Sequence, residues 1–424
     1  MPRYRAVLVS LTVVSLLAGC TGKPSPTTSA TPHASATTRP EPDGPHAHIA
    51  LPQSDTVIAR GASAADLAIS TSQALFQQTP AVVLVGETDE ASMAAGARTA
   101  TKLGVPLLLT PAEAVTDAGA ALRTELTRLA PRTVITVGPQ ATAWQSNANS
   151  PTPTVSVTAS GDAQGAALPD IVPDTPLDSL FVLAVQGRAS EAAVATAHAA
   201  GTEVVMLASA DPRSNSASIK ALTGHGAARV LAIGSAFGSA ALLRSRLQVA
   251  GTGVELPGGG QVIFPGRRMV ALYGHPGAPV LGVLGEQNLT ASVARAKQVA
   301  AAYSALVSEP VVPAFEIIAT VAAASAGPDG NYSNETAAAA LKPWVETAKA
   351  NGIYVVLDLQ PGRSDFLSQA KLYSSLLLYP NVGLALDPEW HMKSNQVPME
   401  VIGSVDSSEI NKTSQWLAQL VKDH

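Results

Sequence analysis

Short apolar runs rich in β-branched residues alternate with longer helical segments along most of this chain. The first run, "PAVVLVG" at 80–86, is followed by a helical segment at 89–104. A second run at 105–110, a helix at 120–130 and a third run at 133–138 continue the pattern. Strands that alternate with helices form parallel sheets whose two faces are both covered, which is why the strands read as continuous apolar runs. We therefore predict an α/β fold built on a parallel sheet.

The same order of segments recurs about 97 residues further along the chain, where Gly201 takes the place of Gly104. The corresponding strands and helices are expected at 180–187, 190–201, 202–208, 216–227 and 229–234. Self-similarity at a fixed offset is the mark of a repeated structural unit. We predict two tandem α/β units, at 55–148 and, in a degenerate form, at 149–250.

Three stretches of the first unit resemble a known family. These are "VIARGASAADLAISTSQALF", "VVLVGETDEASMAAGARTATKLGVPLLLTP" and "LAPRTVITVG". They are similar to the type 2 cell-wall-binding repeat over about 55–140, and 175–245 is similar more weakly. The resemblance implies retention on anionic wall polymers at the surface of a Gram-positive bacterium. The chain departs from the family at Glu90–Met93, where the repeat carries Asp-Ala-Leu, and at Gly138–Pro139, where it carries two glycines.

The N-terminus has the pattern of a lipoprotein signal peptide over residues 1–20. Arg3 and Arg5 precede an apolar run at 6–17, which is too short to span a bilayer comfortably. The run ends in "LAGC", which resembles the lipobox of bacterial lipoproteins, and Cys20 is the single cysteine of the chain. The resemblance implies cleavage before Cys20 and attachment of palmitate and other acyl chains to it. We expect a protein anchored to the extracytoplasmic face of the cell membrane, facing the cell wall.

Residues 21–54 are rich in Thr, Ser, Pro and Ala and poor in large apolar side chains. Such a segment buries too little apolar surface to fold, so we predict a disordered tether. The net charge of −5 excludes nucleic acid as a main partner, because neutralising phosphates requires a basic face. We expect neither a cofactor nor a metal site, and the expected partners are wall polymer or glycan and, through Cys20, the membrane.

A Gly/Pro-rich linker at 251–267 precedes a third module at 268–424. Its expected strands lie at 268–274, 311–322, 353–360 and 382–387, and its expected helices at 289–307, 334–352, 366–378 and 407–423. Four β/α units predict a partial (β/α) barrel-like module, since a closed barrel of this type needs about eight. A half-barrel that pairs with another copy, a truncated barrel and an open α/β sheet all fit this pattern.

Polar residues occur in or directly after each of these strands. The candidate catalytic carboxylates are Glu316, Asp358, Asp387 and Glu389, and the candidate ligand-binding residues are His275, Trp390 and His391. Side chains alternate along a strand, so Gly383, Ala385, Asp387 and, if the extended conformation persists, Glu389 share one face. The small residues Gly383 and Ala385 are expected to leave room for a ligand in front of the two carboxylates. Because the carboxyl ends of barrel strands meet at one mouth, we expect the carboxylates to line a common pocket.

This arrangement resembles the TIM-barrel glycoside hydrolases as a class, in architecture and in the Asp-x-Glu of "LALDPEW". The resemblance implies one carboxyl kept protonated as an acid and another ionised as a base or nucleophile. Trp390 would stack on a sugar ring, and His275 or His391 would orient the ligand. A strand-end Asp that caps a turn explains the same residue without a site.

Two classes of function remain open from the sequence. One is a lipid-anchored envelope protein whose repeats contact wall polymer and whose C-terminal module binds or hydrolyses wall glycan. The other is a non-catalytic envelope scaffold or a solute-binding lipoprotein. Whether the chain is an enzyme is undecided at this level, and any activity is expected to be of the glycoside-hydrolase type.

Overall fold

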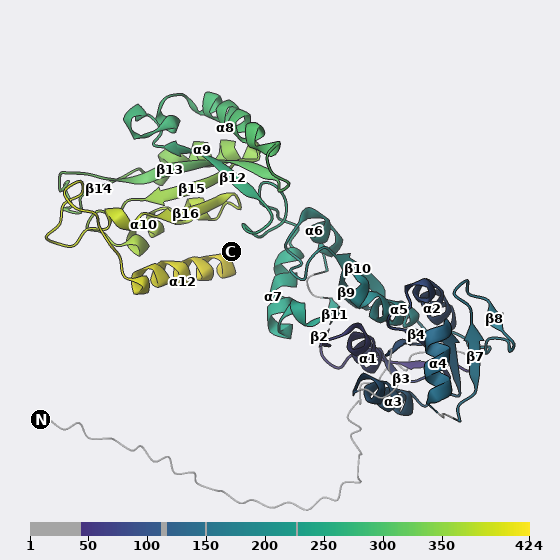
Figure 1. The fold of residues 1–424 in the computed structure, drawn as a ribbon. Coiled ribbons are helices and arrows are strands. Elements are labelled where there is room, and N and C mark those ends of the chain that lie inside the picture. The colour runs from purple at the N-terminus through teal and green to yellow at the C-terminus, as the bar shows by residue number, and fades with distance from the viewer. Residues whose placement is uncertain (1–43, 112–116, 149–150, 226–227) are drawn as a thin grey trace, which may run out of the picture. The chain divides into compact units, whose positions relative to one another are not determined.

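The computed structural model describes residues 44–111, 117–148, 151–225 and 228–424. Their strands form three sheets built mainly of parallel strands and one antiparallel pair, with helices packed on the sheets (Figure 1). The prediction of an α/β fold with parallel sheets is therefore confirmed. The predicted lipid anchor at Cys20 and residues 21–43 of the predicted tether lie outside the described residues. The prediction of a disordered tether is wrong for its last part, because His48–Ile49 form a strand that pairs with Phe76–Gln78, and Ala47 and Ile49 are buried in the core.

The first sheet has the order β5-β4-β6-β7-β8, in which β8 alone runs antiparallel. Its strands are β4 (Ala81–Gly86), β5 (Leu107–Thr110), β6 (Thr133–Val137), β7 (Thr154–Val157) and β8 (Ala163–Gln164), and its helices are α2 (Glu90–Leu103), α3 (Asp117–Leu129) and α4 (Pro139–Asn147). All six residues of β4 are buried, as expected for a central strand covered on both faces. Asp89 caps the start of α2 by accepting from the Ser92 amide, and Gly104 ends it at φ 65°.

The second sheet has the order β10-β9-β11-β2, and all of its pairs are parallel. Its elements are β2 (Thr56–Ala59), β9 (Leu180–Val185), β10 (Glu203–Leu207), β11 (Arg229–Ile233), α5 (Glu191–Ala199), α6 (Ser216–Leu222), α7 (Ala240–Ala250) and the 3-10 turns η1 (Arg188–Ser190) and η2 (Ser235–Phe237). The order β10-β9-β11 repeats the order β5-β4-β6 of the first sheet. The fourth place departs from the predicted unit bounds of 55–148 and 149–250. β2 lies within the predicted first unit but pairs with β11 of the second sheet, and β7 lies within the predicted second unit but pairs with β6 of the first sheet.

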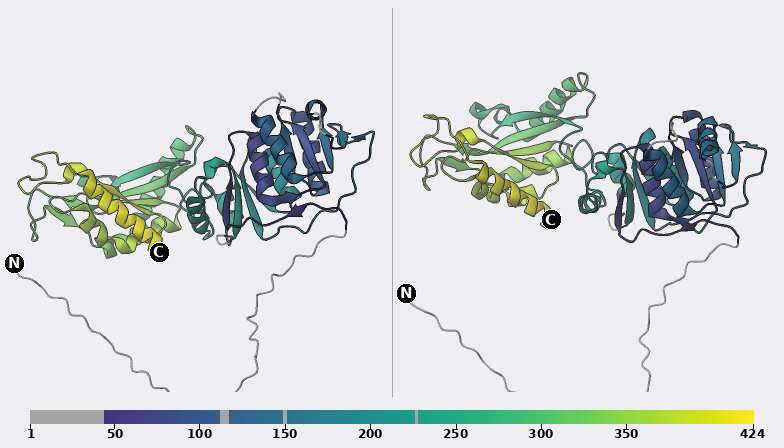
Figure 2. Two further views of the ribbon diagram at one scale, coloured as in Figure 1. Left: turned by 90° about the horizontal axis from the view of Figure 1, so that it is seen from below. Right: turned by 60° about the horizontal axis from the view of Figure 1, so that its bottom comes forward.

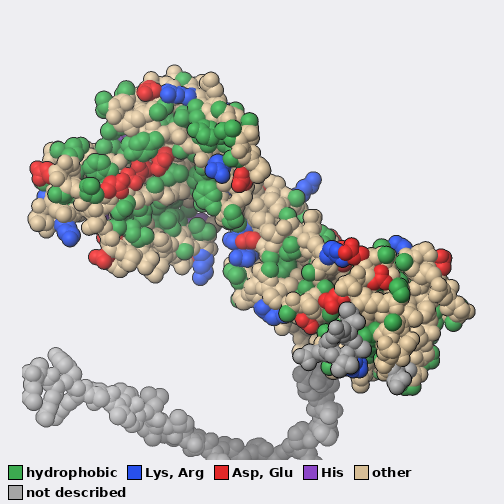
Figure 3. All heavy atoms as spheres, in the orientation of Figure 1, with side chains coloured by type: hydrophobic (Ala, Val, Ile, Leu, Met, Phe, Trp, Pro, Cys, Tyr) green, Lys and Arg blue, Asp and Glu red, His purple; other side chains and the backbone are tan. Residues whose placement is uncertain are grey.

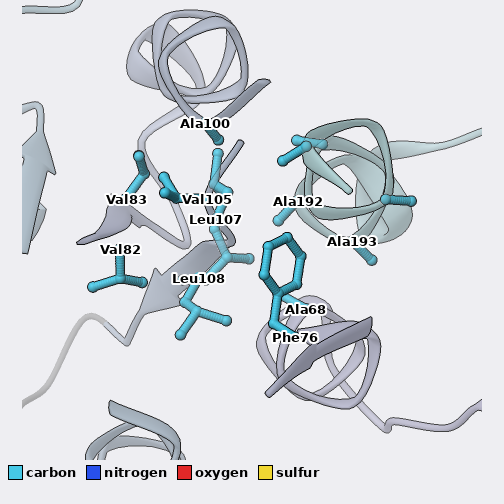
Figure 4. Close-up of a cluster of buried hydrophobic side chains, with 14 of the residues drawn as sticks. Ala68, Phe76, Val82, Val83, Ala100, Val105, Leu107, Leu108, Ala192 and Ala193 are labelled. Carbon is cyan, nitrogen blue, oxygen red and sulfur yellow. The ribbon is translucent and has the colours of Figure 1, made fainter. Parts of the chain in front are cut away.

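Helix α1 (Ala64–Leu75) helps to join the two sheets into one hydrophobic core. Ser63 and Asp66 form a capping box at its start, with each side chain accepting from the other residue's backbone N–H. Phe76 opens β3 (Phe76–Gln78), which pairs with β1 (His48–Ile49). Figure 4 shows Phe76 beside Ala68 and Ala192, and these side chains belong to a single buried cluster that includes residues of both sheets.

The C-terminal module contains a sheet of the order β12-β13-β15-β16, in which these strands are parallel and follow the order of the chain. The elements are β12 (Arg268–Gly274), β13 (Val311–Ala322), β14 (Ser333–Glu335), β15 (Tyr354–Leu359), β16 (Val382–Leu386), α8 (Leu289–Ser304), α9 (Ala338–Ala350), α10 (Phe366–Leu372), α11 (Ser374–Leu377), α12 (Ser407–Asp423) and the turns η3 (Pro279–Leu281), η4 (Val283–Gly285) and η5 (Pro388–Trp390). Parallel neighbours in chain order, with helices between the strands, are the connectivity of a (β/α) barrel.

The two faces of this sheet differ in composition. One face carries Phe315, Ile317, Val355 and Leu357, which are fully buried in one cluster with the helices of the module. Along the same strands, alternate residues point to the other face, where Ala314, Ile318 and Asp358 are buried and Glu316 and Val356 are partly exposed. Helix α12, yellow in Figures 1 and 2, packs against α10.

Two of the predicted helices in this module differ from those observed. The predicted helix at 334–352 begins only at Ala338, because the preceding residues form β14 and pair antiparallel with the end of β13. The predicted helix at 366–378 is divided at Tyr373, whose hydroxyl donates to the carbonyls of Ala319 at 2.8 Å and Thr336 at 2.9 Å. Tertiary hydrogen bonds therefore override the local helical pattern at both places.

Candidate carboxylate site

The carboxylates Glu316, Asp358 and Asp387 are brought to one face of the C-terminal sheet by strand register. Glu316 on β13 pairs with Val356, and Asp358 on β15 pairs with Ala385 on β16. Asp387 lies two residues beyond Ala385 and therefore projects to the same face. Figure 3 shows acidic side chains gathered over these strands within a largely apolar surface. The fold thus places three of the four candidate carboxylates on one sheet face, and the fourth, Glu389, lies beyond the strand in the turn η5.

Asp358 and Asp387 form the centre of the site. Asp358 is 1% exposed, and burial, followed by the charge of Asp387, raises the pKa of its carboxyl to about 8. A hydrogen bond links the two carboxyl groups, which requires a proton between them. The direction of the shifts assigns that proton to Asp358, which donates to Asp387. The pair therefore carries a single negative charge around neutral pH.

The other carboxylates surround this pair. Burial, followed by the charge of Glu389, raises the pKa of Asp387, whereas hydrogen bonds from Asp358 and Gln360 oppose the rise. Burial and the charge of Asp387 also raise the pKa of Glu316. Glu389 is exposed at the rim, in the turn η5 after β16. Carboxyls of different burial thus lie close together.

Tyr273 is a site residue that the sequence analysis missed. It pairs with Glu316 across β12 and β13 and is 41% exposed. Burial, followed by the charges of Asp358, Asp387, Glu316 and Glu389, raises the pKa of its phenol to about 12. Tyr273 lies near the end of a predicted strand, two residues before His275. Residues two apart on a strand share a face, so this spacing could have identified Tyr273 as a site residue.

Gln360, which directly follows β15, fixes the geometry of the pair. It is 6% exposed, and its side-chain carbonyl accepts from the Ala322 amide at 3.1 Å. Its amide group hydrogen bonds to Asp387 and lies 3.5 Å from the Tyr273 hydroxyl. A further buried bond, from Thr320 to Gln369 at 2.8 Å, holds the neighbouring end of β13.

Two residues predicted to bind ligand are held by other parts of the module. The His275 ring bonds to the Thr336 hydroxyl at 2.9 Å. The His391 ring lies 3.2 Å from the carboxylate of Glu409 on α12 and stacks on Phe366. His391 therefore links the loop after β16 to α10 and α12.

Trp390 lies with Glu389 in a surface hollow of about 230 Å³, whose other lining residues include Met399 and Ile402. Met399 is 71% exposed and Ile402 is 85% exposed, so the hollow presents an apolar rim beside a carboxylate. The space above Gly383, which the sequence suggested was left for a ligand, contains the Tyr354 hydroxyl. A Cβ on Gly383 would lie 2.6 Å from that oxygen.

Two arginines of the second repeat unit, Arg229 and Arg244, are held by oxygen atoms of the chain. Arg229 donates to the carbonyl of Pro52 and to Asp55, and Arg244 donates to the carbonyls of Ala228 and Asp55. These bonds hold the chain that leads into β2 against the second sheet. A separate hollow of about 780 Å³ lies between α2 and α5. It is lined by apolar side chains together with charged ones of both signs, and it contains none of the site carboxylates.

Within the described ranges, no group of three or more His, Cys, Asp or Glu residues is arranged to hold a metal ion. No helix in the described part of the chain is long and apolar enough to cross a membrane. The fold and the site together define an α/β protein with an open, carboxylate-lined sheet face.

No protein-family model matches the chain, and no curated protein matches it. Among solved structures, it is similar to Cwp8 from Clostridium difficile, with 13% sequence identity and a TM-score of 0.23. The match covers 86% of this chain and 52% of that chain, so this chain spans about half the length of that protein. A likeness at this level does not carry a functional argument, which must come from the site itself.

Proposed function

We propose that this chain is a bacterial cell-envelope protein whose C-terminal module binds and hydrolyses glycan of the cell wall. The hydrogen-bonded pair of Asp358 and Asp387 is the observation that carries the proposal. It lies at the ends of adjacent parallel strands, on a partly exposed face, with Glu316 and Glu389 beside it. Glycoside hydrolysis requires this combination of protonated and ionised carboxyls.

We assign the roles of the carboxyls from their positions. Glu316, whose pKa is raised, gives its proton to the glycosidic oxygen as the bond to the sugar breaks. Asp387 faces the positive charge that develops on the ring, and Asp358 is a positioning residue that holds the shared proton. Glu389, exposed at the rim, takes the proton of the attacking water. Protons are conserved over the cycle, because Glu316 recovers the proton that Glu389 accepts.

Trp390 supplies a binding surface for the sugar. Aromatic faces stack on the apolar faces of sugar rings, and the exposed Met399 and Ile402 extend that surface. Because Glu389 lines the same hollow, a ring held there lies beside a carboxylate.

Hydrolysis of purified peptidoglycan by the full chain tests this proposal, with released reducing ends as the readout. We expect Asp387→Asn, Glu389→Gln and Glu316→Gln each to lower the rate by about 100-fold or more, as loss of an acid, base or charge-stabilising group does. Glu309→Gln is the matched control, because Glu309 is exposed and precedes the opposite end of β13. Unchanged hydrolysis in the three site variants would exclude the catalytic assignment.

Binding without cleavage is the second candidate function. The sheet ends in β12 on one side and β16 on the other, and this open form leaves the carboxylates more solvated than a closed barrel would. A non-catalytic module would retain the chain on insoluble peptidoglycan and release no reducing ends. Loss of that retention in Trp390→Ala would locate the binding at the same face.

We further propose that a lipid anchor at Cys20 holds the chain on the extracytoplasmic face of the membrane and that the repeat units contact wall polymer. The support is the lipobox-like "LAGC" and the resemblance of the repeats. Growth of an expressing bacterium with a labelled palmitate analogue tests the anchor. Label and membrane association are expected for the wild-type chain and not for Cys20→Ser, and equal labelling of both would overturn the proposal.

A further inference from the structure

We propose that the hollow between α2 and α5 is the surface through which two copies of this chain associate, with the helices of one copy antiparallel to those of the other. The hollow contains none of the site carboxylates, so the proposal does not depend on the binding or hydrolysis of glycan. It is carried by the direction of the two helices, by the apolar part of the lining and by the distribution of charge along the hollow.

The two helices that form the hollow pack against each other and run in the same direction (Figure 1). At their N-terminal ends, Arg188, which precedes α5, forms an ion pair with Glu90 of α2. At their C-terminal ends, a Cβ on Gly104 would lie 3.6 Å from the carbonyl oxygen of Ala199. Two parallel helices that are adjacent at both ends leave a groove between them, into which another helix can pack.

The apolar part of the lining consists of small and adaptable side chains. Ala94 and Ala97 of α2 and Ala195 of α5 end in a single methyl group, so the backbone of another helix can approach them closely. Met93 and Val194 complete this part of the lining and are partly exposed. A methionine adapts its shape to the surface that packs on it. The hollow is therefore suited to a protein surface that brings apolar side chains of its own.

Charges of opposite sign are separated along the hollow. Glu90 and Glu191 lie in the first turns of their helices, whereas Lys102 lies in the last turn of α2 and Arg98 one turn before it. Twelve residues separate Glu90 from Lys102, which corresponds to about 18 Å along the helix axis. Among the residues that the structure describes, Arg98, Lys102 and Glu191 have no ion-pair or hydrogen-bond partner for their side chains. The hollow thus has an acidic end and a basic end.

A second copy of the chain supplies the complementary surface. A two-fold axis perpendicular to the helices turns the second hollow end for end, so that its acidic end faces the basic end of the first. Glu191 of each copy then faces Arg98 and Lys102 of the other copy, and each contact is made twice. Under the same axis, α2 of each copy packs into the groove of the other and covers its apolar lining.

An anionic wall polymer fits the hollow less well than a second copy does. Its negative groups would be attracted by Arg98 and Lys102 but repelled by Glu191 at the other end. Its polar backbone would also leave the apolar lining without apolar contacts. Charge complementarity along the whole hollow therefore favours a partner with both signs of charge.

Sedimentation velocity of the full chain over about 1–100 µM tests the proposal. Reducing conditions are used, because Cys20 could otherwise link two chains by a disulfide bond. We expect the wild-type chain to form a dimer as its concentration rises. Raised salt should weaken the dimer, because the charges at the two ends of the hollow are screened. A wild-type chain that remains monomeric over the whole range would overturn the proposal.

Two charge-reversal variants test the assignment of the surface. Arg98→Glu combined with Lys102→Glu, and separately Glu191→Lys, should each weaken dimerisation by about ten-fold or more, because like charges then face each other. Lys220→Glu combined with Lys371→Glu is the matched control, since both lysines are exposed and lie outside the hollow. The control should dimerise as the wild-type chain does. Far-UV circular dichroism confirms that each variant is folded.

A mixture of the two charge-reversal variants tests the antiparallel arrangement. In a mixed dimer the reversed charges of one chain face charges of opposite sign on the other chain. We therefore expect the mixture to dimerise about as well as the wild-type chain, although neither variant does so alone. A mixture that associates no better than its separate components would overturn the proposal, as would dimerisation that both variants retain. If the wild-type chain is monomeric and Arg98→Glu with Lys102→Glu lowers its retention on insoluble peptidoglycan, the hollow contacts wall polymer instead.

Discussion

The carboxyl groups of Asp358 and Asp387 are hydrogen bonded to each other at the ends of the adjacent parallel strands β15 and β16. Two ionised carboxylates cannot form such a bond, so the fold retains a proton that an exposed aspartate would release at about pH 4. In the unfolded chain the two carboxyls are exposed to water and do not hold this proton. The stability of the module must therefore depend on pH.

The first prediction concerns the direction of that dependence. The pKa of Asp358 is about 8 in the fold, so between about pH 4 and pH 8 the folded state binds more protons than the unfolded state. The free energy of unfolding should fall as the pH rises through this range, by at most about 1.4 kcal/mol per pH unit for one proton. Urea unfolding at several pH values measures it.

Asp358→Asn is the variant that isolates this effect. The amide keeps the shape of the side chain and does not ionise. The free energy of unfolding should therefore depend less on pH, and near pH 8 the stability of the variant relative to the wild-type chain should be higher than at low pH. Asp423→Asn, near the exposed C-terminus, should follow the wild-type curve. A wild-type stability that rises between pH 4 and pH 8 would contradict the shared proton.

The second prediction concerns Gln360. Gln360→Leu removes the acceptor of the Ala322 amide and the hydrogen bond to Asp387 that opposes the rise in its pKa. The pKa of Asp387 should rise further, and an unpaired buried N–H should destabilise the fold by about 1–3 kcal/mol. Carbon-detected NMR titration of the Asp carboxyls measures the pKa of Asp387, and urea unfolding measures the loss of stability. Gln419→Leu, at an exposed site on α12, should alter neither.

The third prediction concerns the salt bridge of α3. Glu125 is fully buried and accepts from Arg128 at 2.6 and 2.8 Å and from Ser72 at 2.6 Å. Arg128→Met leaves that buried carboxylate without its charged partner. We expect this to lower the free energy of unfolding by about 3 kcal/mol. The exposed pair of Arg295 and Glu286 is the contrast, since Arg295→Met should cost less than about 1 kcal/mol.

A double variant separates the ion pair from general packing at this position. Glu125→Leu combined with Arg128→Met removes both charges and should recover most of the loss, because no unpaired buried charge remains. If the double variant is no more stable than Arg128→Met alone, the cost lies in lost packing and the assignment to the buried charge is wrong.

The fourth prediction concerns the contact between α5 and the edge strand β5. The Thr196 hydroxyl donates to the Leu107 carbonyl at 2.8 Å and accepts from the Leu107 amide at 3.0 Å. Thr196→Val leaves both backbone groups unpaired in a buried place and should destabilise the chain by about 2 kcal/mol or more in urea unfolding. Thr196→Ser keeps the hydroxyl and should recover much of this, whereas the exposed Thr124→Val should have little effect.

The sequence predicted much of the C-terminal module because its strands are apolar, β-branched and bounded by polar turns. The predicted strand at 268–274 and helix at 407–423 coincide with β12 and α12, and the grouping of Glu316, Asp358 and Asp387 follows from alternation along parallel strands. These features depend on local pattern, which a single sequence displays directly.

Features that depend on distant partners were not visible. The sequence of β14 predicts the start of a helix. In the fold it is a strand, because its backbone pairs with the end of β13. Tyr273 reads as an ordinary strand residue, and only the register with Glu316 makes it part of the site. The sequence also does not show that the His391 ring lies 3.2 Å from the carboxylate of Glu409, which comes from a later helix.

The sequence by itself determined the α/β class, the repeated order of strands and the strands that carry carboxylates, because hydrophobic period and turn residues are local properties. Only the tertiary structure decided that β2 completes the sheet of the second unit and that Asp358 is buried against Asp387. Strand pairing joins residues far apart in the chain, and a pKa depends on which neighbours exclude water and share charge. Those neighbours exist only once the chain has folded.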